Sequence, residues 1–479
     1  MNVSCRATRS PLRCLASAAV VVGLLAWAGP ATARSAPTYD GALSTPVEDP
    51  YYPSHGDPGV DALHYGLDLR WSRATRVLHG TARITLRVTS DTDRVTLDLG
   101  KPLTVAAVSL DGAGVSWTRS GNHLLVDTPP LVAGTRHHLT VVYHGTPHPV
   151  TAPTSRSDLP YVGWHTTGTG AVWTMQEPFG AFTWYPVNDQ PSDKAFYDAR
   201  IDVPGDWVGI FNGRLVHRRT TAGRTVTLWH LGSPAASYLT TIAIGDYRGY
   251  RDTGPHGLPI RYWVHRGDTS TLSELRRTPG MIRWLERRLG PYPFSRIGTV
   301  VVPSLSGMET QTLVTMGGKL LRDYPPREFR SDLLHEYAHQ WYGDTVTPDN
   351  WPDLWLNESF AMYTQFRWEV SQGWRTMADV RDELDSLDAQ LRAEDGPPGA
   401  YFPQDFADTC VYYCGARMLD RLRSKLGAAT FDSAWRAWPQ RHRWASVDRG
   451  DYISWLDYRT GRSLDSFFTT WLTSPTSPP

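Results

Sequence analysis

His335-Glu336-Tyr337-Ala338-His339, followed by Trp355-Leu356-Asn357-Glu358, is the stretch that decides how the rest of the chain is interpreted. A spacing of four residues places both imidazoles on one face of a helix, where they can share a tetrahedral metal ion. Glu336 follows the first of these histidines, so its carboxylate can reach a water at the metal and act as a general base. The motif therefore predicts a metal centre with a base beside it.

Glu358 adds a third ligand to this pair. It lies 19 positions after His339, and the loop from Asp344 to Pro352 can bring its carboxylate back to the metal. Two histidines, one glutamate and a water form an open catalytic zinc site rather than a closed structural one. The alternative is two surface histidines and a helix-capping glutamate, which a motif of this length disfavours. We expect one Zn²⁺ per chain, bound by His335, His339 and Glu358.

The second half of the chain, around this motif, has the apolar period of helices. Gly290-Pro291 ends the first of them, and Ile297 to Val302 is an apolar run typical of a buried strand. The expected helices are Leu272 to Leu289 (interrupted at Pro279-Gly280), Glu328 to Tyr342, Asp353 to Ser371, Met377 to Glu394, Tyr412 to Leu426 and Leu464 to Leu472.

The first half has the period of strands. β-Branched and aromatic residues occur in short runs, and Asp111-Gly112 and Ser120-Gly121 mark turns between them. Short strands at regular intervals predict an all-β domain that ends near residue 250. The expected strands are Leu63 to Leu69, Arg76 to Val88, Arg94 to Leu99, Val108 to Val115, His138 to Tyr143, Ala199 to Val203, Val208 to Phe211, Thr225 to Leu231 and Leu239 to Ile244.

The N-terminus has the three parts of a secretory signal. Arg6 to Arg13 is a basic leader, Leu15 to Gly29 is an apolar run, and Ala31-Thr32-Ala33 is a small-x-small cleavage site. A membrane anchor is the alternative, but an anchor needs about 20 apolar residues, and this run is shorter and followed by Pro30. We expect cleavage after residue 33, secretion, and no stable membrane insertion afterwards.

Charge and cysteine content indicate which partners to exclude and which redox compartment suits the chain. Loss of the leader removes three arginines from 48 basic residues and leaves 45 against 48 acidic residues. Nucleic-acid binding would need a concentrated basic patch, so no nucleic acid is expected as a partner. Cleavage also leaves Cys410 and Cys414 as the remaining cysteines. A disulfide between them fits an oxidising compartment if the first residues of their helix are not helical, and two buried thiols are the alternative.

Four blocks of sequence carry a resemblance to a known family. His335 to Ala361 resembles the HExxH-x18-E block of the aminopeptidase N family of zinc peptidases, which includes the leukotriene hydrolases. Gly290 to Phe294 is similar to the family's turn before the first core strand. Ser306 to Thr310 resembles its GxMEN exopeptidase motif, and Val411 to Ala416 its VYxKGA block. The resemblance runs from about Asp49 to Leu472 and is stronger in the second half.

The departures from the family pattern are few. Ser306 replaces the first Gly of the exopeptidase motif, Thr310 its Asn, and Cys414 the usual Lys of the last block. The family's long C-terminal helical domain or extra β-domain is not expected after Leu472. The active site should then be more open than in the larger members.

The resemblance implies roles for the matching residues. Glu336 would activate the water and pass its proton to the leaving amine. Tyr412 would donate a hydrogen bond to the developing oxyanion, with a core aromatic as the alternative. Glu309 would hold the free α-ammonium of the substrate, with an edge-strand carboxylate in water as the alternative, and Gly307 and Met308 would border the substrate.

The β-domain should supply a second ligand for the same amine. Gln176 and Glu177 lie where the family has a TQxE-type block, in an alignment that is open by one or two residues. Glu177 is the preferred amine contact because an anion suits a cation, and Gln176 would line the pocket.

Together these observations predict a multidomain α+β protein. Residues 1–33 would be the signal peptide, 34–250 an N-terminal all-β domain of sandwich or saddle type, 251–473 a thermolysin-like catalytic domain, mainly helical with a small sheet, and 474–479 a mobile tail. The expected function is that of a secreted zinc aminopeptidase, which hydrolyses N-terminal residues from peptides with a free N-terminus by a zinc-activated water.

Two rival functions stay open. An endopeptidase or an epoxide hydrolase could use the same site. A secreted binding protein with a disabled peptidase fold is the rival from another class, although the intact ligands, the base and Tyr412 argue against it.

Overall fold

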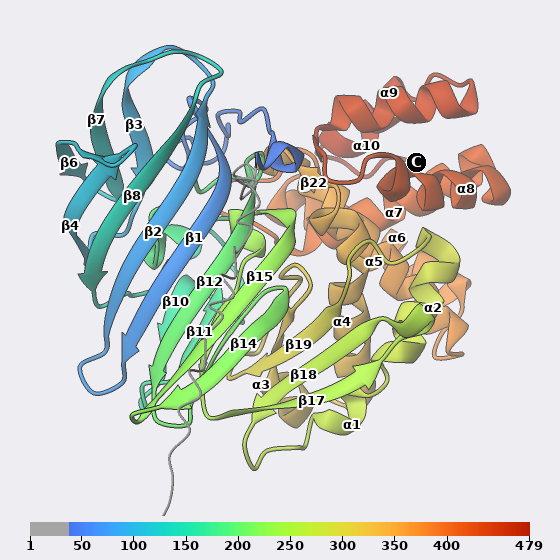
Figure 1. Ribbon diagram of the computed structural model, residues 1–479. Helices are drawn as coiled ribbons and strands as arrows, with labels where there is room; N and C mark the ends of the chain where they lie inside the picture. Colours follow the sequence, from blue (N-terminus) through green and yellow to red (C-terminus); the bar gives the residue numbers. More distant parts are fainter. Residues whose placement is uncertain (1–37) are drawn as a thin grey trace, which may run out of the picture. The chain divides into compact units, whose positions relative to one another are not determined.

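Residues 38–479 are described in the computed structural model, and Figure 1 follows their path. Tyr39–Pro479 forms one unit in which a β-rich part precedes a helical part, as the sequence predicts. The expected signal peptide, residues 1–33, lies outside the described residues. None of the helices in the described range is long and apolar enough to cross a membrane.

An eight-stranded sheet forms the body of the β-rich part (Figure 1). Apolar side chains at alternate positions of β1 and β2 are buried, because successive residues of a strand point to opposite faces. The first strand pairs with β2 in antiparallel and with β12 in parallel orientation. In spatial order the strands are β14 (Arg214–Thr221), β15 (Arg224–Ala236), β12 (Lys194–Pro204), β1 (Val60–Ser72), β2 (Val77–Val88), β8 (Arg136–Gly145), β4 (Leu103–Leu110) and β5 (Ala113–Gly114).

Two smaller sheets complete the β-rich part. Trp71 of β1 and Trp164 of β10 pack with ring centroids 5.3 Å apart, so the large sheet and the five-stranded sheet share one aromatic core. The five-stranded sheet consists of β13 (Val208–Phe211), β16 (Ile242–Gly245), β11 (Val172–Met175), β10 (Tyr161–Thr166) and β9 (Val150–Thr151). The three-stranded sheet consists of β3 (Thr92–Asp98), β7 (His123–Leu131) and β6 (Trp117–Ser120).

A second five-stranded sheet belongs to the helical part. The predicted buried strand Ile297–Val302 is its central strand β19, which is buried along its whole length. Its neighbours, in spatial order, are β17 (Tyr247–Thr253), β18 (Pro259–His265), β19, β21 (Val314–Gly317) and β20 (Gly307–Met308). The edge strand β20 leads directly into Glu309. A separate pair joins β22 (Thr347–Pro348) to β23 (Ser446–Val447).

The helices cover this sheet and extend beyond it (Figure 1). Their bounds are α1 (Leu272–Leu275), α2 (Thr278–Leu289), α3 (Gly318–Asp323), α4 (Pro326–Ala338), α5 (Trp355–Ser371), α6 (Met377–Asp395), α7 (Thr409–Leu426), α8 (Ala428–Arg441), α9 (Arg449–Thr460) and α10 (Asp465–Thr473). The sequence prediction has no counterpart for α8 and α9, because Pro439 interrupts the apolar pattern of the first and Gly450 that of the second. Pro279 is the second residue of α2 and does not break it, since a proline is tolerated in the first turn of a helix.

A disulfide joins Cys410 and Cys414 at the start of α7. The condition that the first residues be non-helical is not met, because α7 begins at Thr409. The bridge instead spans one turn of the helix, with the two Cα atoms 4.8 Å apart, which lies within the ordinary range for a disulfide. The start of α7 is thus fixed covalently two residues on either side of Tyr412.

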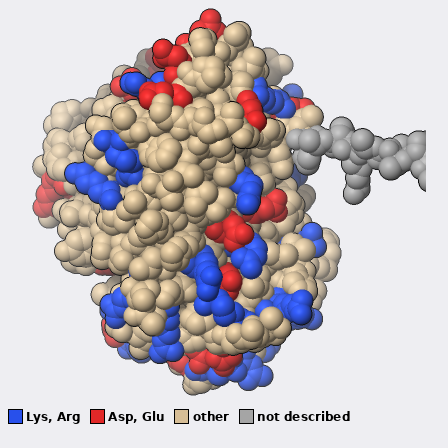
Figure 2. Space-filling view, turned by 60° about the vertical axis from the view of Figure 1, so that its left-hand side comes forward, with Lys and Arg blue, Asp and Glu red and all other residues tan. Residues whose placement is uncertain are grey.

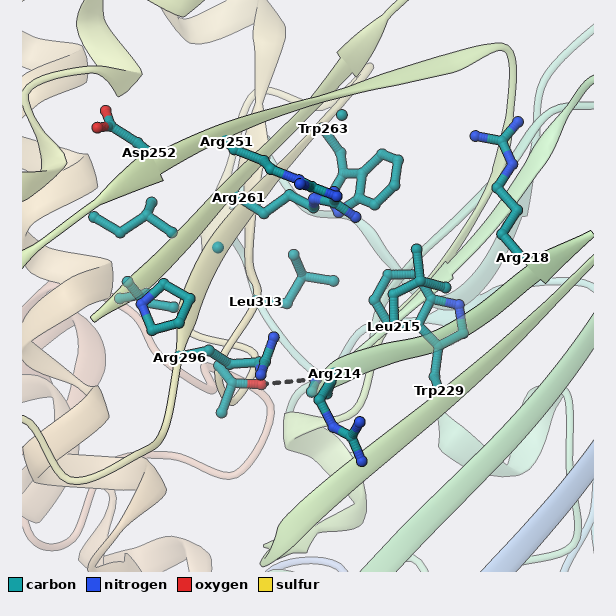
Figure 3. A pocket seen from close by; sticks show the side chains of 17 residues that line it. Arg214, Leu215, Arg218, Trp229, Arg251, Asp252, Arg261, Trp263, Arg296 and Leu313 are labelled. Atoms are coloured by element: carbon teal, nitrogen blue, oxygen red, sulfur yellow. Dashed lines mark hydrogen bonds between the residues drawn. The ribbon is translucent and has the colours of Figure 1, made fainter. Parts of the chain in front are cut away.

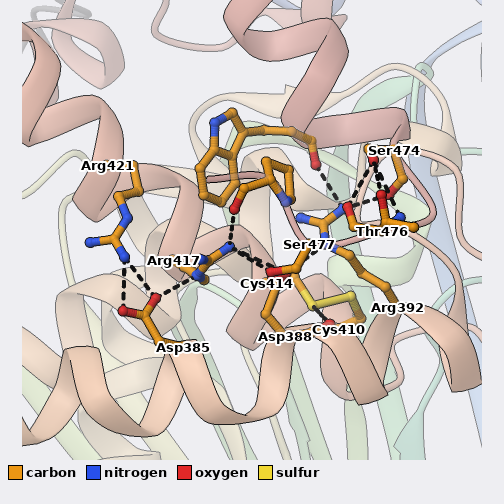
Figure 4. A network of polar contacts seen from close by, with 12 residues as sticks. Asp385, Asp388, Arg392, Cys410, Cys414, Arg417, Arg421, Ser474, Thr476 and Ser477 are labelled. Atoms are coloured by element: carbon orange, nitrogen blue, oxygen red, sulfur yellow. Dashed lines mark hydrogen bonds and ion pairs between the residues drawn. A yellow bond between two sulfur atoms is a disulfide. The ribbon is translucent and has the colours of Figure 1, made fainter.

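The C-terminal residues lie against α6 and α7 beside this bridge (Figure 4). Arg392 donates to the carbonyl of Ser474 over 2.9 Å, and Arg417 donates to the Ser477 hydroxyl over 3.1 Å. Both guanidinium groups also bind the buried carboxylate of Asp388. The segment that the sequence assigns to a tail therefore closes a polar network around the disulfide.

Candidate active site

The three predicted metal ligands meet where α4 and α5 pack together. His335 is on α4, His339 follows its last residue, and Glu358 is in the first turns of α5. Glu358 Oε2 lies 3.1 Å from His335 Nε2 and 3.2 Å from His339 Nε2. All three side chains are buried, and their ligand atoms lie within 4.8 Å of one another. The fold brings the three ligands together as the spacing predicts.

The hydrogen bonds of His339 test whether a metal fits this cluster. Its Nδ1 lies 3.0 Å from the carbonyl oxygen of Tyr342, and a carbonyl can only accept, so Nδ1 carries the proton. The lone pair of Nε2 then faces Glu358, and Nε2 has no hydrogen-bond partner among the described residues. A lone pair opposite a carboxylate oxygen is repulsive unless a cation lies between them, and such an N–H to carbonyl bond commonly orients a metal-bound histidine. Two nitrogens and one oxygen are a donor set that suits Zn²⁺.

Charge coupling within the cluster keeps Glu358 ionised. Burial alone would raise its pKa, but the two adjacent imidazoles of His339 and His335 hold the pKa of Glu358 below its usual value. Burial lowers the pKa of His335, which favours the neutral imidazole that a metal requires.

Glu336 lies between the ligands and the edge strand β20. Gly307 makes room for it, because a Cβ at Gly307 would lie only 2.4 Å from Glu336 Oε1. Burial and then the nearby Glu309 raise the pKa of Glu336 well above its usual value. A carboxyl group with a raised pKa can take up a proton and return it near neutral pH.

Two further carboxylates lie beside the metal ligands. Glu309 is buried and Glu177 is half-buried, and one oxygen of each, Oε1, has no hydrogen-bond partner within residues 38–479. With Glu358 they form a group whose oxygens lie within 4.8 Å of one another. Burial and the repulsion of Glu309 raise the pKa of Glu177 well above its usual value. Buried acids without partners call for a cation.

Gln340 fixes Glu309 to the helix of the metal ligands. Its side-chain Nε2 donates to the backbone oxygen of Glu309 over 2.9 Å, and its Oε1 accepts from the backbone N–H of Thr312 over 3.0 Å. Both ends of this short segment are therefore held by the residue after His339.

Gln176 does not line the cleft, contrary to the sequence prediction. Its side chain donates to Ser237 and Thr240 and accepts from Trp184 Nε1, so all its polar atoms are used inside the β-rich part. Its backbone N–H points to the sulfur of Met308 over 3.4 Å. Gln176 thus contacts Met308 through its backbone, while its side chain anchors the residue before Glu177 inside the β-rich part.

Tyr412 reaches the site from the first turn of α7. The helix approaches α5 closely, because Gly415 lies against Ser359 and the Ser359 hydroxyl donates to the carbonyl of Val411 over 2.7 Å. The Tyr412 ring lies 5.8 Å from that of His335, centroid to centroid. Its ring therefore borders the metal ligands.

Arg156 is a site residue that the sequence analysis missed. It lies in the loop between β9 and β10, and its Nη1 donates to the Tyr412 hydroxyl over 3.1 Å. Its other nitrogen, Nη2, is 2.7 Å from Asp158 and 3.2 Å from the Ser306 hydroxyl. A single arginine in a loop carries no spacing that could have indicated this role.

These side chains line one open cleft of about 540 Å³ between the β-rich and helical parts. A neighbouring pocket of about 600 Å³ shares part of its wall and extends it along α5 and α6. The shared residues are Glu328, Asp332, Met362, Gln365 and Tyr413.

A β-rich domain followed by a helical domain with a buried His–His–Glu cluster and an adjacent glutamate defines the fold and site of a zinc metallopeptidase. Comparison with known families agrees. The Peptidase family M1 domain matches residues 273–471, and the Peptidase M1 N-terminal domain matches residues 61–239. The chain belongs to the M1 family of zinc metallopeptidases, the aminopeptidase N-like family that the sequence blocks indicate.

Solved structures and curated relatives give the same result. The M1 zinc metallopeptidase from Deinococcus radiodurans is 26% identical with a TM-score of 0.79, covering 91% of this chain and 99% of that chain. A mutant of that enzyme bound to the substrate Tyr-Ser-Ala gives the same values. Aminopeptidase M1 of Arabidopsis thaliana is 24% identical over 62% of this chain and 36% of its own length. Aminopeptidase B of Rattus norvegicus is 27% identical over 64% and 50%. The match thus spans half or less of these curated relatives.

Proposed function

We propose that this protein is a secreted zinc aminopeptidase that removes N-terminal residues from peptides. The observation that carries the proposal is the pair of carboxylates, Glu309 and Glu177, which have unpartnered oxygens beside the metal ligands. In this proposal they block the path that a longer peptide would need beyond its N-terminal residue. A free α-ammonium supplies the cation that they need.

Zn²⁺ would be held by His335, His339 and Glu358, one ion per chain. When bound, it supplies Lewis acidity at the scissile carbonyl. The donor set, the burial and the unpartnered lone pair of His339 support this assignment.

Glu336 would take a proton from the attacking water and give it to the leaving amine. Its raised pKa suits both steps. Tyr412 would donate a hydrogen bond from its hydroxyl to the oxygen that becomes negative in the transition state. Because Arg156 donates to the Tyr412 oxygen, it occupies a lone pair of that oxygen and leaves the hydroxyl proton free to point into the cleft.

Peptides with a free N-terminus are the proposed substrates. Support comes from the Deinococcus radiodurans mutant, which was solved with the tripeptide Tyr-Ser-Ala. An N-acetylated or internal residue would leave both carboxylates buried without a counter-charge, at a cost of several kcal/mol. We therefore favour an exopeptidase over the endopeptidase and epoxide-hydrolase rivals.

Secretion is part of the proposal. The leader at residues 1–33 has the composition of a signal peptide, and the Cys410–Cys414 bridge is of the kind that persists in an oxidising compartment. N-terminal sequencing of protein recovered from the culture medium tests this. A chain that stays inside the cell and begins at Met1 would count against export without touching the peptidase assignment.

The decisive experiment compares one peptide with its N-acetylated form. We expect cleavage of the free peptide and at least about 100-fold lower kcat/KM for the acetylated one, since the lost ammonium contacts are charge-assisted. Glu309→Ala should lose most of the activity and much of this preference, with zinc content unchanged.

Glu328→Gln is the matched control. It removes a carboxylate from the exposed outer wall of the same cleft and should keep the preference for free amines. Equal kcat/KM for the free and acetylated peptides in the parent protein would instead identify an endopeptidase.

A further inference from the structure

A second cavity lies between the edges of two sheets, away from the metal ligands (Figure 3). It has a volume of about 610 Å³. One wall is the edge strand β14, and the other is formed by β17 and β18 of the helical part. Thr312 and Leu313, just after the Glu309 segment, form part of its floor.

Five arginines line this cavity, and they come from four different parts of the chain. They face a single acid, Asp252, so the lining carries a formal charge of +4. The arginines are Arg214, Arg218, Arg251, Arg261 and Arg296. The Asp252 carboxylate already accepts from the Tyr262 hydroxyl and from the backbone N–H of Thr253.

None of the five guanidinium groups has an acidic partner in the described part of the chain. Within residues 38–479, no ion pair or side-chain hydrogen bond joins any of them to another residue, and of the five only Arg261 packs on a ring there, 4.9 Å above Trp263. Arginines close by do have acids: Arg266 pairs with Asp246 over 2.7 Å, and Arg224 pairs with Asp202 over 2.6 Å. Other neighbours, such as Arg219, have no ion pair within residues 38–479 either, so the cavity differs from its surroundings in gathering five such guanidinium groups on one lining.

The fold holds these like charges together at a cost. Arg251 and Arg261 are direct partners across the β17–β18 pair, an arrangement that is destabilising for like charges. They lie side by side next to Trp263 in Figure 3. Burial and then the charges of Arg251, Arg296 and Arg218 lower the pKa of Arg261. An anion in the cavity would remove this repulsion.

The remaining walls of the cavity are apolar. Trp229 of β15 and Trp263 of β18 lie with ring centroids 6.0 Å apart, and Leu313 lies between the arginines in Figure 3. Concave sites with apolar walls and a few convergent polar groups are typical of small-ligand binding. On the face shown in Figure 2, basic side chains occur in separate groups with acidic ones between them, unlike the continuous basic track that a nucleic acid requires.

We propose that this arginine cavity binds a compact polyanion, a small molecule that carries two or more phosphate or sulfate groups. Guanidinium groups bind such groups through short, paired hydrogen bonds. The convergence of five of them on 610 Å³ matches several charges on one small body. An acidic peptide would need several consecutive acids in the same space, so the small polyanion fits better.

The test titrates tripolyphosphate into the protein by isothermal titration calorimetry at about 0.15 M salt, where screening suppresses weak surface binding. We expect it to bind the parent protein with Kd in the range of about 1–100 µM, at least about 10-fold tighter than orthophosphate. The double variant Arg218→Gln/Arg261→Gln should weaken binding at least about 30-fold. Its thermal midpoint should stay close to that of the parent.

Arg219→Gln/Arg266→Gln is the matched control, with the same charge change nearby. Arg219 is the next residue of β14 and Arg266 follows β18, and neither lines the cavity. This variant should bind within about twofold of the parent. Because the cleft is untouched in both variants, tripolyphosphate held by the metal would persist in both.

Three outcomes would overturn the proposal. They are no binding of tripolyphosphate at millimolar concentration, an equal loss of binding in the control variant, and orthophosphate binding as tightly as tripolyphosphate. A hexaglutamate peptide that binds more tightly than tripolyphosphate, through the same arginines, would replace the small polyanion by an acidic peptide.

Discussion

The acidic cleft and the arginine cavity lie at the two ends of one short segment, residues 308–313. Met308 and Glu309 line the first, and Thr312 and Leu313 line the second. Each collects more like charges than its own lining can balance: the cleft has Glu177 and Glu309 with unpartnered oxygens and Arg156 as a cation, and the cavity has five arginines that face Asp252. The same physical feature therefore indicates a missing ligand in both places, of opposite sign.

The two sites differ in how close together their residues lie in the sequence. The cleft depends on His335, Glu336 and His339 in one helix and Glu358 in the next, a fixed spacing that only a metal site explains. The cavity depends on arginines spread from Arg214 to Arg296, which only the pairing of strands brings together. A site built from sheet edges leaves no local motif.

The metal ligands should give the largest effect. We expect Glu358→Ala or His335→Ala protein to be metal-poor and to have no detectable activity, because two protein ligands hold zinc poorly. Glu336→Gln should keep about one zinc per chain and lose about 10²–10⁴-fold in kcat. Metal analysis by mass spectrometry beside the rate assay checks both. An active metal-free protein would end the metallopeptidase interpretation of the cleft.

Tyr412→Phe should give the next largest loss of activity. Loss of one oxyanion donor costs about 10²–10³-fold in kcat, while KM should hardly change, because the hydroxyl acts in the transition state. Steady-state kinetics with one free peptide separate the two constants. A large change in KM with normal kcat would make Tyr412 a packing residue of α7.

Arg156 should have a smaller effect that depends on Tyr412. Arg156→Gln should lower kcat about 10-fold by releasing the Tyr412 hydroxyl, and Arg156→Lys, which keeps a donor and the charge, should restore part of it. In a Tyr412→Phe background Arg156→Gln should change kcat little, because the two residues act as a unit. Additive losses in the double variant would contradict a positioning role.

The fold and most of the cleft could be predicted from the sequence because their signals are local. The helical period gave α4 and α5, and the alternating strands gave β1 and β2. Arg156 could not be predicted, because its partner Tyr412 is 256 positions away. Gln176 was misplaced because sequence adjacency to Glu177 says nothing about which neighbour turns into the core. The arginine cavity needs the Arg251–Arg261 register, which no single segment contains.

A paired arginine provides the reference for the unpaired ones. Arg330 of α4 binds Glu274 of α1 through two hydrogen bonds of 2.5 and 2.9 Å. These bonds hold the pKa of Glu274 below its usual value of 4.5, although burial opposes them. The stability that the pair contributes is therefore fully present above about pH 4.5 and is lost as the pH falls through the lower, folded-state pKa.

Glu274→Gln should accordingly destabilise the protein by about 1 kcal/mol at pH 7. Calorimetry should show a thermal midpoint lower by roughly 1–2 °C. The difference from the parent should shrink as the pH is lowered below 4.5, because a protonated glutamic acid resembles glutamine. If the difference in thermal midpoint stays constant as the pH is lowered well below 4.5, Arg330 gains nothing from the charge of Glu274.

Arg251→Gln should give the smallest effect, and one of opposite sign. It removes one of two like charges that face each other across β17 and β18, so the thermal midpoint in phosphate-free buffer should rise by less than about 1 °C. The rise should be the same at pH 5 and pH 8, because the pair contains no carboxylate. Saturating tripolyphosphate should reverse the order of the two proteins, since the parent then gains the stability of a bound anion that the variant holds less well. Arg266→Gln, which breaks the pair with Asp246, should lower the midpoint in both buffers. If Arg251→Gln also lowers it in phosphate-free buffer, the arginines of the cavity are not in repulsive contact, and the likeness between the two sites fails on the basic side.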